Sequence, residues 1–297
     1  MQESHLTRRA FLIGAAALAP LLRAAADDRA AAGPVQTIEA RIAAIEKGVA
    51  GRLGVAALDT VSGRRIDHRS AERFPMCSTF KFLLAAAVLR RVDLKQDQLA
   101  RRIAYGRGDL LEYAPIARQR LQEGGMSLSD LCAAAVEYSD NTAANLLLKV
   151  LGGPGAITRY AASLGDPLTR LDRTEPSLNE AVPGDERDTT SPSAMLDNLR
   201  IILLGKALSP AARGQLQAWL IANTTGDSRL RAGLSAGWKA GDKTGTGEHG
   251  STNDITILWP PGRPPILVAA YLTDSPAPLV ERNAALAEVG RVVAESL

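Results

Sequence analysis

The segment from Ser78 to about Val92 has the periodicity of a helix but is apolar on nearly every side, with Phe80, Phe82, Leu83, Leu84, Val88 and Leu89. A helix with one apolar stripe can lie on a surface, whereas a helix that is apolar all round has to be enclosed. We therefore expect this helix at the centre of a domain. The chain has 297 residues, 46% apolar and 23% charged, which is enough for a sizeable core.

Helical patterns fill the rest of the middle of the chain, whereas strand patterns occupy both ends. Helices are expected over residues 35–49, 128–138, 142–151, 156–164, 192–204, 210–223 and 279–293, and strands over 52–59, 64–68, 237–246, 255–259 and 265–272. This order predicts an antiparallel sheet flanked by helices and built from both termini, with an all-helical domain inserted into it. The expected α/β domain comprises residues 34–69 and 221–297, and the helical domain comprises residues 70–220.

The N-terminus has the features of a cleavable export signal. A twin arginine, Arg8-Arg9, precedes an apolar run over residues 12–22, and small residues follow at 24–26. A run of about eleven residues is too short to span a bilayer, which takes roughly 20. We expect residues 1–26 to be removed during export, and the twin arginine followed by Phe-Leu resembles a Tat signal. No later run is long enough for a membrane helix, so we expect a soluble periplasmic or secreted protein.

The charge balance predicts no polyanionic partner. The chain has a formal net charge of +3, and removal of residues 1–26, with Arg8, Arg9 and Arg23 against Glu3, lowers it by 2 to +1. A nearly neutral protein has no electrostatic reason to bind nucleic acid or a membrane surface. The oligomeric state cannot be inferred from the sequence, and a monomer is the default expectation.

Ser78-Thr79-Phe80-Lys81 opens the central helix as a Ser-x-x-Lys motif. Positions i and i+3 share a face of a helix, so the serine hydroxyl and the lysine amine lie together. A serine becomes nucleophilic when a base takes its proton, and a desolvated lysine with a lowered pKa can act as that base. Alone, this motif is also compatible with a capping serine and a surface lysine.

Two further motifs follow. Ser139-Asp140-Asn141 lies in a tight turn between two expected helices, where Ser139 can relay a proton and the Asn141 amide can bond a substrate carbonyl. Lys243-Thr244-Gly245 lies on an expected strand, where the glycine permits close backbone approach and the other two side chains can hold an anion.

Ser-x-x-Lys, Ser-Asp-Asn and Lys-Thr-Gly in this order resemble the signature of class A β-lactamases and penicillin-binding proteins. The resemblance covers nearly all of the chain after the export signal. It implies a β-lactamase/transpeptidase-like fold and attack by Ser78 on a β-lactam ring, without a cofactor. The histidines His5, His68 and His249 show no metal-ligand spacing, so a zinc mechanism is not expected.

The polar stretch over residues 170–191 distinguishes a β-lactam hydrolase from a transpeptidase. Its Glu175-Pro176-Ser177-Leu178-Asn179 resembles the Glu-x-x-x-Asn segment of the class A omega loop, in which the two side chains hold the hydrolytic water. The resemblance also implies that Arg173 and Asp188 form the ion pair that closes the loop, expected over residues 172–188. We therefore predict hydrolysis of penicillins and cephalosporins, which confers antibiotic resistance.

The resemblance implies roles for four flanking residues. Tyr113 matches the aromatic wall of the pocket, and Arg229 the guanidinium that some members direct at the substrate carboxylate. Thr246 would donate its hydroxyl to that carboxylate, which Lys243, Thr244 and Arg229 also hold. The backbone N–H groups of Ser78 and Thr246 would form the oxyanion hole. Whether Lys81 or Glu175 takes the serine proton stays open.

Three other functions are weighed against this prediction. The Glu-x-x-x-Asn segment argues against a DD-peptidase or transpeptidase. A β-lactam receptor domain, which stays acylated, is normally tethered to a membrane, and no tether is apparent here. A serine-dependent glutaminase of related fold fits neither the export signal nor the loop. The substrate range beyond penicillins and early cephalosporins cannot be inferred from the sequence.

The two cysteines, Cys77 and Cys132, could form one disulfide in an oxidising compartment. The resemblance implies otherwise. In some relatives the position of Cys132 is bridged to the position held here by Ala85, and in many carbapenem-hydrolysing relatives the position of Cys77 is bridged to that of Gly247. We therefore predict two free thiols and, as a corollary, weak carbapenem turnover.

Overall fold

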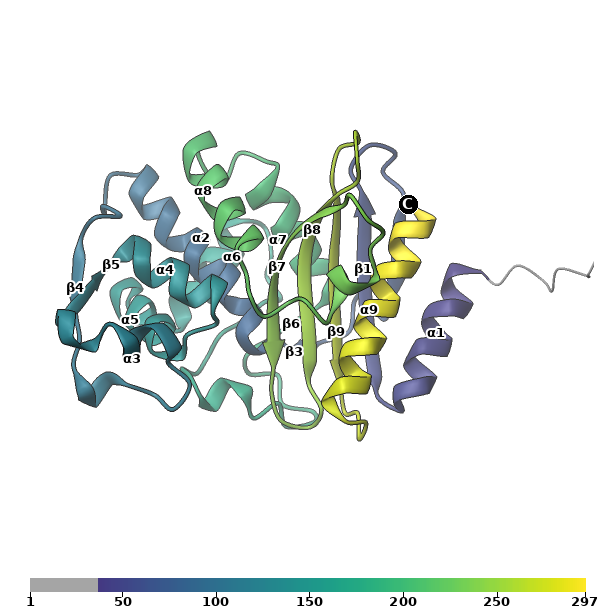
Figure 1. The fold of residues 1–297 in the computed structure, drawn as a ribbon, viewed down its shortest axis with the longest axis horizontal. Coiled ribbons are helices and arrows are strands. Elements are labelled where there is room, and N and C mark those ends of the chain that lie inside the picture. The colour runs from purple at the N-terminus through teal and green to yellow at the C-terminus, as the bar shows by residue number, and fades with distance from the viewer. Residues whose placement is uncertain (1–36) are drawn as a thin grey trace, which may run out of the picture. The chain divides into compact units, whose positions relative to one another are not determined.

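The structure, a computed structural model, describes residues 37–297, so the predicted export signal lies outside the described residues. A five-stranded antiparallel sheet has the strand order β2–β1–β9–β8–β7 (Figure 1). Its strands are β1 (Arg52–Asp59), β2 (Arg65–His68), β7 (Lys239–Thr246), β8 (Thr252–Trp259) and β9 (Ile266–Thr273). Because β1 pairs along its whole length with β9, the two ends of the described chain form one sheet, as predicted.

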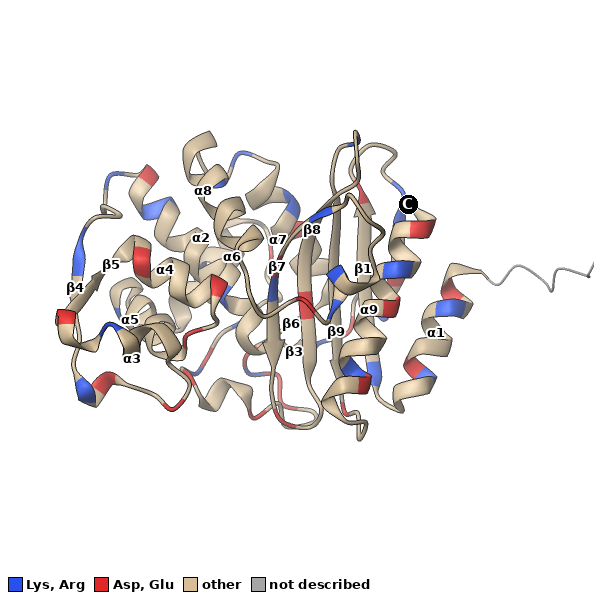
Figure 2. Ribbon diagram, in the orientation of Figure 1, with Lys and Arg blue, Asp and Glu red and all other residues tan. Residues whose placement is uncertain are grey.

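One face of the sheet is covered by helices α1 (Ile38–Val49) and α9 (Leu279–Ser296). The hydroxyl of Thr37 caps α1 by accepting a hydrogen bond from Ala40 N at 3.2 Å. Buried residues of both helices pack against strand residues that point to this face of the sheet. The helix residues include Ile42, Val49, Leu286, Val289 and Val293, and the strand residues include Leu53, Val55 and Val268. The solvent sides of α1 and α9 carry basic and acidic residues in mixture (Figure 2).

The opposite face packs against α7 (Pro192–Leu203) and α8 (Pro210–Ile221), which belong to the helical region. That region also contains α3 (Pro115–Gln119), α4 (Leu128–Glu137), α5 (Asn141–Leu151) and α6 (Gly155–Ser163) around α2 (Phe80–Asp93). Every residue of α2 from Phe80 to Leu89 is buried. The prediction that this helix lies at the centre is therefore confirmed. Within residues 37–297, no helix has both the length and the apolar character needed to cross a membrane.

The structure departs from the sequence predictions in the short elements and in β8. The strands β3 (Phe74–Pro75), β4 (Arg102–Ala104), β5 (Gly125–Ser127) and β6 (Thr189–Thr190), and α3, were not expected. Runs of two to five residues are too short to show a periodicity. Strand β8 begins three residues earlier than predicted, because Thr252, Asn253 and Asp254 are polar yet buried. Their side chains find partners inside the protein, as Asn253 Nδ2 does with Pro75 O at 2.9 Å.

Candidate active site

Ser78 lies in a 3-10 turn, Cys77–Thr79, directly before α2, rather than in the first turn of the α-helix itself. The turn is held from two sides: Thr79 Oγ1 donates to Met76 O at 2.8 Å, and Asn253 Nδ2 donates to the same oxygen at 3.1 Å. Strand β7 passes so close that a Cβ on Gly245 would lie 2.8 Å from Met76 O. Glycine at position 245 therefore allows the strand to approach the backbone of Ser78.

Lys81 lies one turn further and is fully buried. Its Nζ donates to Ser139 O at 2.8 Å and to Asn141 Oδ1 at 2.6 Å, and forms an ion pair with Glu175 Oε1 at 2.9 Å. Burial lowers the pKa of Lys81, against the opposing effect of the nearby Glu175 carboxylate. A buried amine with a lowered pKa can accept a proton more readily than a solvated lysine.

The predicted turn over residues 139–141 joins α4 to α5. Ser139 adopts the left-handed conformation, with φ of 57°. Asp140 Oδ1 accepts a hydrogen bond from Ala143 N at 2.8 Å and so caps α5, while its Oδ2 accepts from Ile116 N and Ala117 N, both at 2.9 Å. Asp140 thus fixes the turn that presents its two neighbours to the pocket.

Lys243 is fully buried on β7 and connects the strand to this turn. Its Nζ donates to Ser139 Oγ at 3.1 Å and to Thr244 O at 2.8 Å. Desolvation lowers the pKa of Lys243 well below its usual value, and the nearby cation of Lys81 lowers it further. A negatively charged ligand in the adjoining pocket would relieve this repulsion.

Glu175 contacts the nucleophile from the loop side. Its Oε1 accepts a hydrogen bond from Ser78 Oγ at 3.2 Å, and its Oε2 accepts one from Asn179 Nδ2 at 2.5 Å. The Oδ1 atom of Asn179 is buried and has no hydrogen-bond partner among the described residues. A free acceptor beside a carboxylate fits a water molecule that donates to both groups.

The loop is closed at its base by Arg173 and Asp188. Arg173 Nε bonds Asp188 Oδ2 at 2.5 Å, and Asp188 Oδ1 accepts from the backbone N–H groups of Asp172 and Arg173 at 2.7 and 2.9 Å. The side chain of Asp188 is 1% exposed and that of Arg173 15%. The expected ion pair is therefore present.

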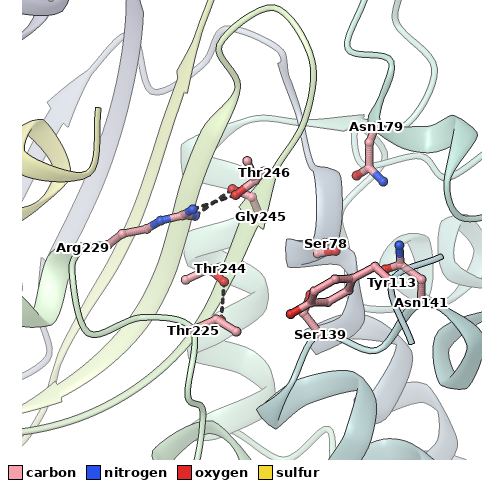
Figure 3. Close-up of a pocket in the computed structure, with 10 residues that line it drawn as sticks. All are labelled: Ser78, Tyr113, Ser139, Asn141, Asn179, Thr225, Arg229, Thr244, Gly245 and Thr246. Carbon is pink, nitrogen blue, oxygen red and sulfur yellow. Dashed lines mark hydrogen bonds between the residues drawn. The ribbon is translucent and has the colours of Figure 1, made fainter. Parts of the chain in front are cut away.

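A cavity of about 310 Å³ opens over Ser78. Figure 3 shows Thr244, Thr246 and Arg229 on one side of Ser78, and Tyr113, Ser139 and Asn141 on the other. Tyr113 is about half exposed, at 52%, as expected for a wall at the mouth of the cavity. Nine of the twelve residues predicted for catalysis or substrate binding line this cavity. The other three, Lys81, Glu175 and Lys243, each form a hydrogen bond with Ser78 or Ser139, which do line it.

Arg229 is buried and makes four hydrogen bonds: to Asn283 Oδ1 at 3.0 Å, Gly245 O at 2.8 Å, Asn253 O at 2.7 Å and Thr246 Oγ1 at 2.6 Å. Desolvation lowers its pKa. A guanidinium has five N–H groups, so these four bonds leave one N–H of Nη2 without a partner among the described residues.

Comparison with known proteins agrees with this geometry. A family model described as "Beta-lactamase enzyme family" matches residues 37–297. The chain is 46% identical to β-lactamase AST-1 of Nocardia asteroides, over 98% of this chain and 96% of that protein. It is 47% identical to β-lactamase L2 of Stenotrophomonas maltophilia, over 97% and 98%. Among solved structures, an ancestral class A β-lactamase is 59% identical, with a TM-score of 0.86 over 88% of this chain and 100% of that one.

The chain belongs to the class A β-lactamases. The family, the fold class and the enzyme class predicted from the three motifs are confirmed. Class A β-lactamases are serine hydrolases that open the β-lactam ring, and this activity confers resistance to the antibiotic.

Two residues of this class A site were missed in the sequence. Asn145 holds the backbone of Glu175 from both sides, because its Nδ2 donates to Glu175 O at 2.9 Å and its Oδ1 accepts from Glu175 N at 3.0 Å. A signal was present, since Asn145 follows Asn141 by four residues and so shares its helix face. Thr225, which lines the cavity beside Thr244, follows α8 and has no comparable signal.

Both cysteines of this β-lactamase are buried free thiols, as predicted. A Cβ on Gly247 would lie 2.7 Å from Cys77 Sγ, so the two positions are adjacent, and a glycine there supplies no sulfur for a bridge. Burial raises the pKa of Cys77 to about 12 and raises that of Cys132 as well.

We predict that neither thiol reacts in the native protein at pH 8, because only an exposed thiolate attacks such a reagent and both thiols are buried, with raised pKa values. Titration with a chromogenic disulfide reagent should detect no thiol in the native state and two after unfolding without a reductant. Fewer than two thiols after unfolding would mean that a disulfide had formed.

Proposed function

We propose that this β-lactamase hydrolyses penicillins and cephalosporins through an ester on Ser78, with Glu175 as the base that activates the hydrolytic water. The observation that carries the proposal is the position of one carboxylate: Glu175 contacts Ser78 Oγ at 3.2 Å and the Asn179 amide at 2.5 Å. A base that reaches both the nucleophile and a water site can serve both halves of a hydrolysis.

The proposed reaction begins with the substrate carboxylate held by Lys243, Thr244, Thr246 and Arg229. Thr246 Oγ1 accepts a hydrogen bond from Arg229 Nη2, so its own proton is directed elsewhere and can be donated to the carboxylate. Asn141 would bond a carbonyl of the substrate side chain, and Tyr113 would pack against it. The lactam carbonyl would accept from the backbone N–H groups of Ser78 and Thr246.

Ser78 Oγ then attacks the lactam carbonyl carbon as its proton passes to a base, and the carbon–nitrogen bond breaks. Of the two candidate bases, Glu175 accepts from Ser78 Oγ directly at 3.2 Å, and Lys81 lies beside it, with its Nζ 2.9 Å from Glu175 Oε1. Ser139 Oγ accepts from Lys243 at 3.1 Å and from Lys81 at 3.4 Å, so its proton is free to be donated to the departing nitrogen. Lys81 and Lys243 can resupply that proton.

In the second half, water bound between Glu175 and Asn179 loses a proton to Glu175 and attacks the ester carbon. The carbon–oxygen bond to Ser78 breaks, and the oxygen regains a proton. A peptidase or a receptor acylated by a β-lactam would lack an efficient second half.

Turnover of a chromogenic cephalosporin by the purified protein tests the proposal. We expect many turnovers per molecule, and their loss in Ser78→Ala. A single stoichiometric burst followed by arrest would indicate a receptor or peptidase instead.

The loop over residues 172–188 is proposed to act as the omega loop, which holds Glu175 in place. We predict that Arg173→Ala slows deacylation more than it lowers stability, because the pair with Asp188 orders the loop and adds little to the core. Leaving the buried Asp188 carboxylate without its ion-pair partner lowers the free energy of unfolding by at most about 3–5 kcal/mol. Acylation and deacylation rates from stopped-flow kinetics, with the melting temperature, measure the two effects separately.

Arg187→Ala is the matched control, since Arg187 lies in the same loop but is 51% exposed and pairs with Asp185 at the surface. Such pairs contribute about 0–1 kcal/mol, so this variant should behave as the parent. Equal losses of acylation and deacylation in Arg173→Ala would count against the loop's proposed role.

We also propose export, with cleavage of residues 1–26, and action in the periplasm or outside the cell. The twin arginine, the short apolar run and the small residues at 24–26 support this. The intact mass of the exported protein should correspond to cleavage near residue 26, and an uncleaved chain would contradict the proposal. We likewise propose a division into residues 34–69 with 221–297, and 70–220. One cluster of buried apolar residues lies entirely within the first part and supports this, while the other cluster combines the helical region with sheet residues such as Ala56, Ile257 and Ala269.

A further inference from the structure

Thr225 lies beside a residue to which the proposed function assigns substrate binding. Its Oγ1 is 2.5 Å from Thr244 Oγ1, and both side chains line the cavity (Figure 3). The inference drawn here rests on the proposed role of Thr244 in holding the substrate carboxylate, and it concerns what controls that role.

Asn223 orients Thr225 through hydrogen bonds to its backbone and side chain. Asn223 Nδ2 donates to Asp242 Oδ2 at 2.6 Å, and Asn223 Oδ1 accepts from Thr225 N at 3.2 Å. A backbone N–H can only donate, so the amide orientation of Asn223 is determined. Asn223 is 3% exposed and Asp242 is 1% exposed, and Asp242 is paired with Arg231, so solvent does not compete for these bonds.

The direction of the Thr225–Thr244 bond follows from counting protons. Thr225 Oγ1 donates to Asn223 Oδ1 at 2.9 Å, which uses the single proton of its hydroxyl. The arrangement with the most hydrogen bonds has Thr225 accepting from Thr244 in the 2.5 Å contact, because Thr244 Oγ1 has no other partner among the described residues. In the free pocket the Thr244 proton is consequently engaged with Thr225 and is not offered to a substrate.

We propose that Thr225 is a positioning residue. It accepts the hydroxyl proton of Thr244 in the free pocket, and Thr244 turns this proton toward the substrate carboxylate only when a carboxylate is bound. A hydrogen bond to an ionised acceptor is roughly twice as strong as one between neutral groups, so a carboxylate can displace Thr225 as the acceptor. A neutral ligand would exchange one neutral bond for another. The contribution of Thr244 thus depends on the ligand's negative charge, and the competing bond reduces its net value.

Thr225→Val tests this proposal, since valine has nearly the same shape but accepts no hydrogen bond. With the competing acceptor removed, Thr244 donates to the carboxylate without loss of an internal bond. We expect KM for benzylpenicillin to fall about 3- to 10-fold, the range of one hydrogen bond. The kcat should change less than about twofold, because the carboxylate is held alike in the ground and transition states. Thr225→Ala should shift KM in the same direction.

The decisive control is the background in which Thr244 is changed. If Thr225 acts through the Thr244 proton, the double variant Thr225→Val, Thr244→Val has the same KM as Thr244→Val alone. If Thr225→Val acts by changing the shape of the pocket, it still changes KM when Thr244 is already valine. Thr225→Ser should restore the parental KM. Thr224→Val makes the same chemical change one residue away, where the hydroxyl bonds Glu137 O at 2.9 Å outside the cavity, and should leave KM unchanged.

An unchanged or raised KM in Thr225→Val overturns the inference, as does a fall in KM that persists in Thr244→Val. These KM values are interpreted only if the parent enzyme turns over β-lactams. Absence of turnover in the parent would instead contradict the proposed function.

Discussion

Glu175→Ala is expected to acylate with benzylpenicillin and then to remain acylated. Ester formation needs Ser78 and a proton acceptor, and the buried amine of Lys81 stays available for that step. Hydrolysis has no such reserve, because the water site proposed on the loop side of the ester consists of Glu175 and Asn179, which are hydrogen-bonded to each other. Loss of a positioned general base costs about 10²- to 10⁴-fold in rate, so deacylation should slow by that factor.

Stopped-flow acylation and the steady-state rate that follows the burst measure the two steps. Glu186→Ala is a matched control, because Glu186 lies in the same loop with its side chain 66% exposed. It should turn over as the parent does. Parental turnover by Glu175→Ala would exclude Glu175 as the base, whereas failure to acylate at all would mean that Lys81 cannot take the serine proton.

Lys81→Met is expected to lose both steps, with kcat/KM reduced by about 10³-fold or more. Methionine fills similar space but removes the cation that lies 2.9 Å from Glu175. Leaving a buried carboxylate without its ion-pair partner is costly, so Glu175 is expected to lose the position from which it contacts Ser78 and Asn179. The variant also lacks the alternative acceptor for the Ser78 proton. Burst and steady-state rates should therefore fall together, in contrast to Glu175→Ala.

Lys149→Met provides the control for this change, since Lys149 is exposed on α5. It should keep parental kinetics. Melting temperatures of both variants verify folding. If Lys81→Met acylated at the parental rate, neither the amine nor its effect on Glu175 would be needed for the attack.

The sequence predicted the order of the elements well because most are long enough to show a period. All five strands of the main sheet and the long helices were expected, with ends displaced by only a few residues. The exact start of α2 could not be predicted, because the 3-10 turn at Ser78 depends on contacts from Asn253, which is 175 residues away along the chain. Tertiary contacts of this kind leave no local pattern.

The motifs located most of the residues around the cavity, but not all of those that orient them. Asn145 and Asn223 act through hydrogen bonds to backbone or to other side chains, and asparagine is common in turns and helix caps. Sequence spacing could have indicated Asn145, since it shares a helix face with Asn141. The direction of the Thr225–Thr244 bond required a count of donors and acceptors, which only the folded arrangement provides.

The site of covalent attachment tests the central claim most directly. Glu175→Ala should be mixed with benzylpenicillin, quenched in acid and digested with trypsin, which cuts after Arg73 and Lys81 and so releases residues 74–81 with Ser78 near the centre. We predict that this peptide gains the mass of one benzylpenicillin molecule, that fragmentation assigns the gain to Ser78, and that Ser78→Ala in the same background gains nothing. An adduct on another residue, or turnover that survives Ser78→Ala, would contradict the account.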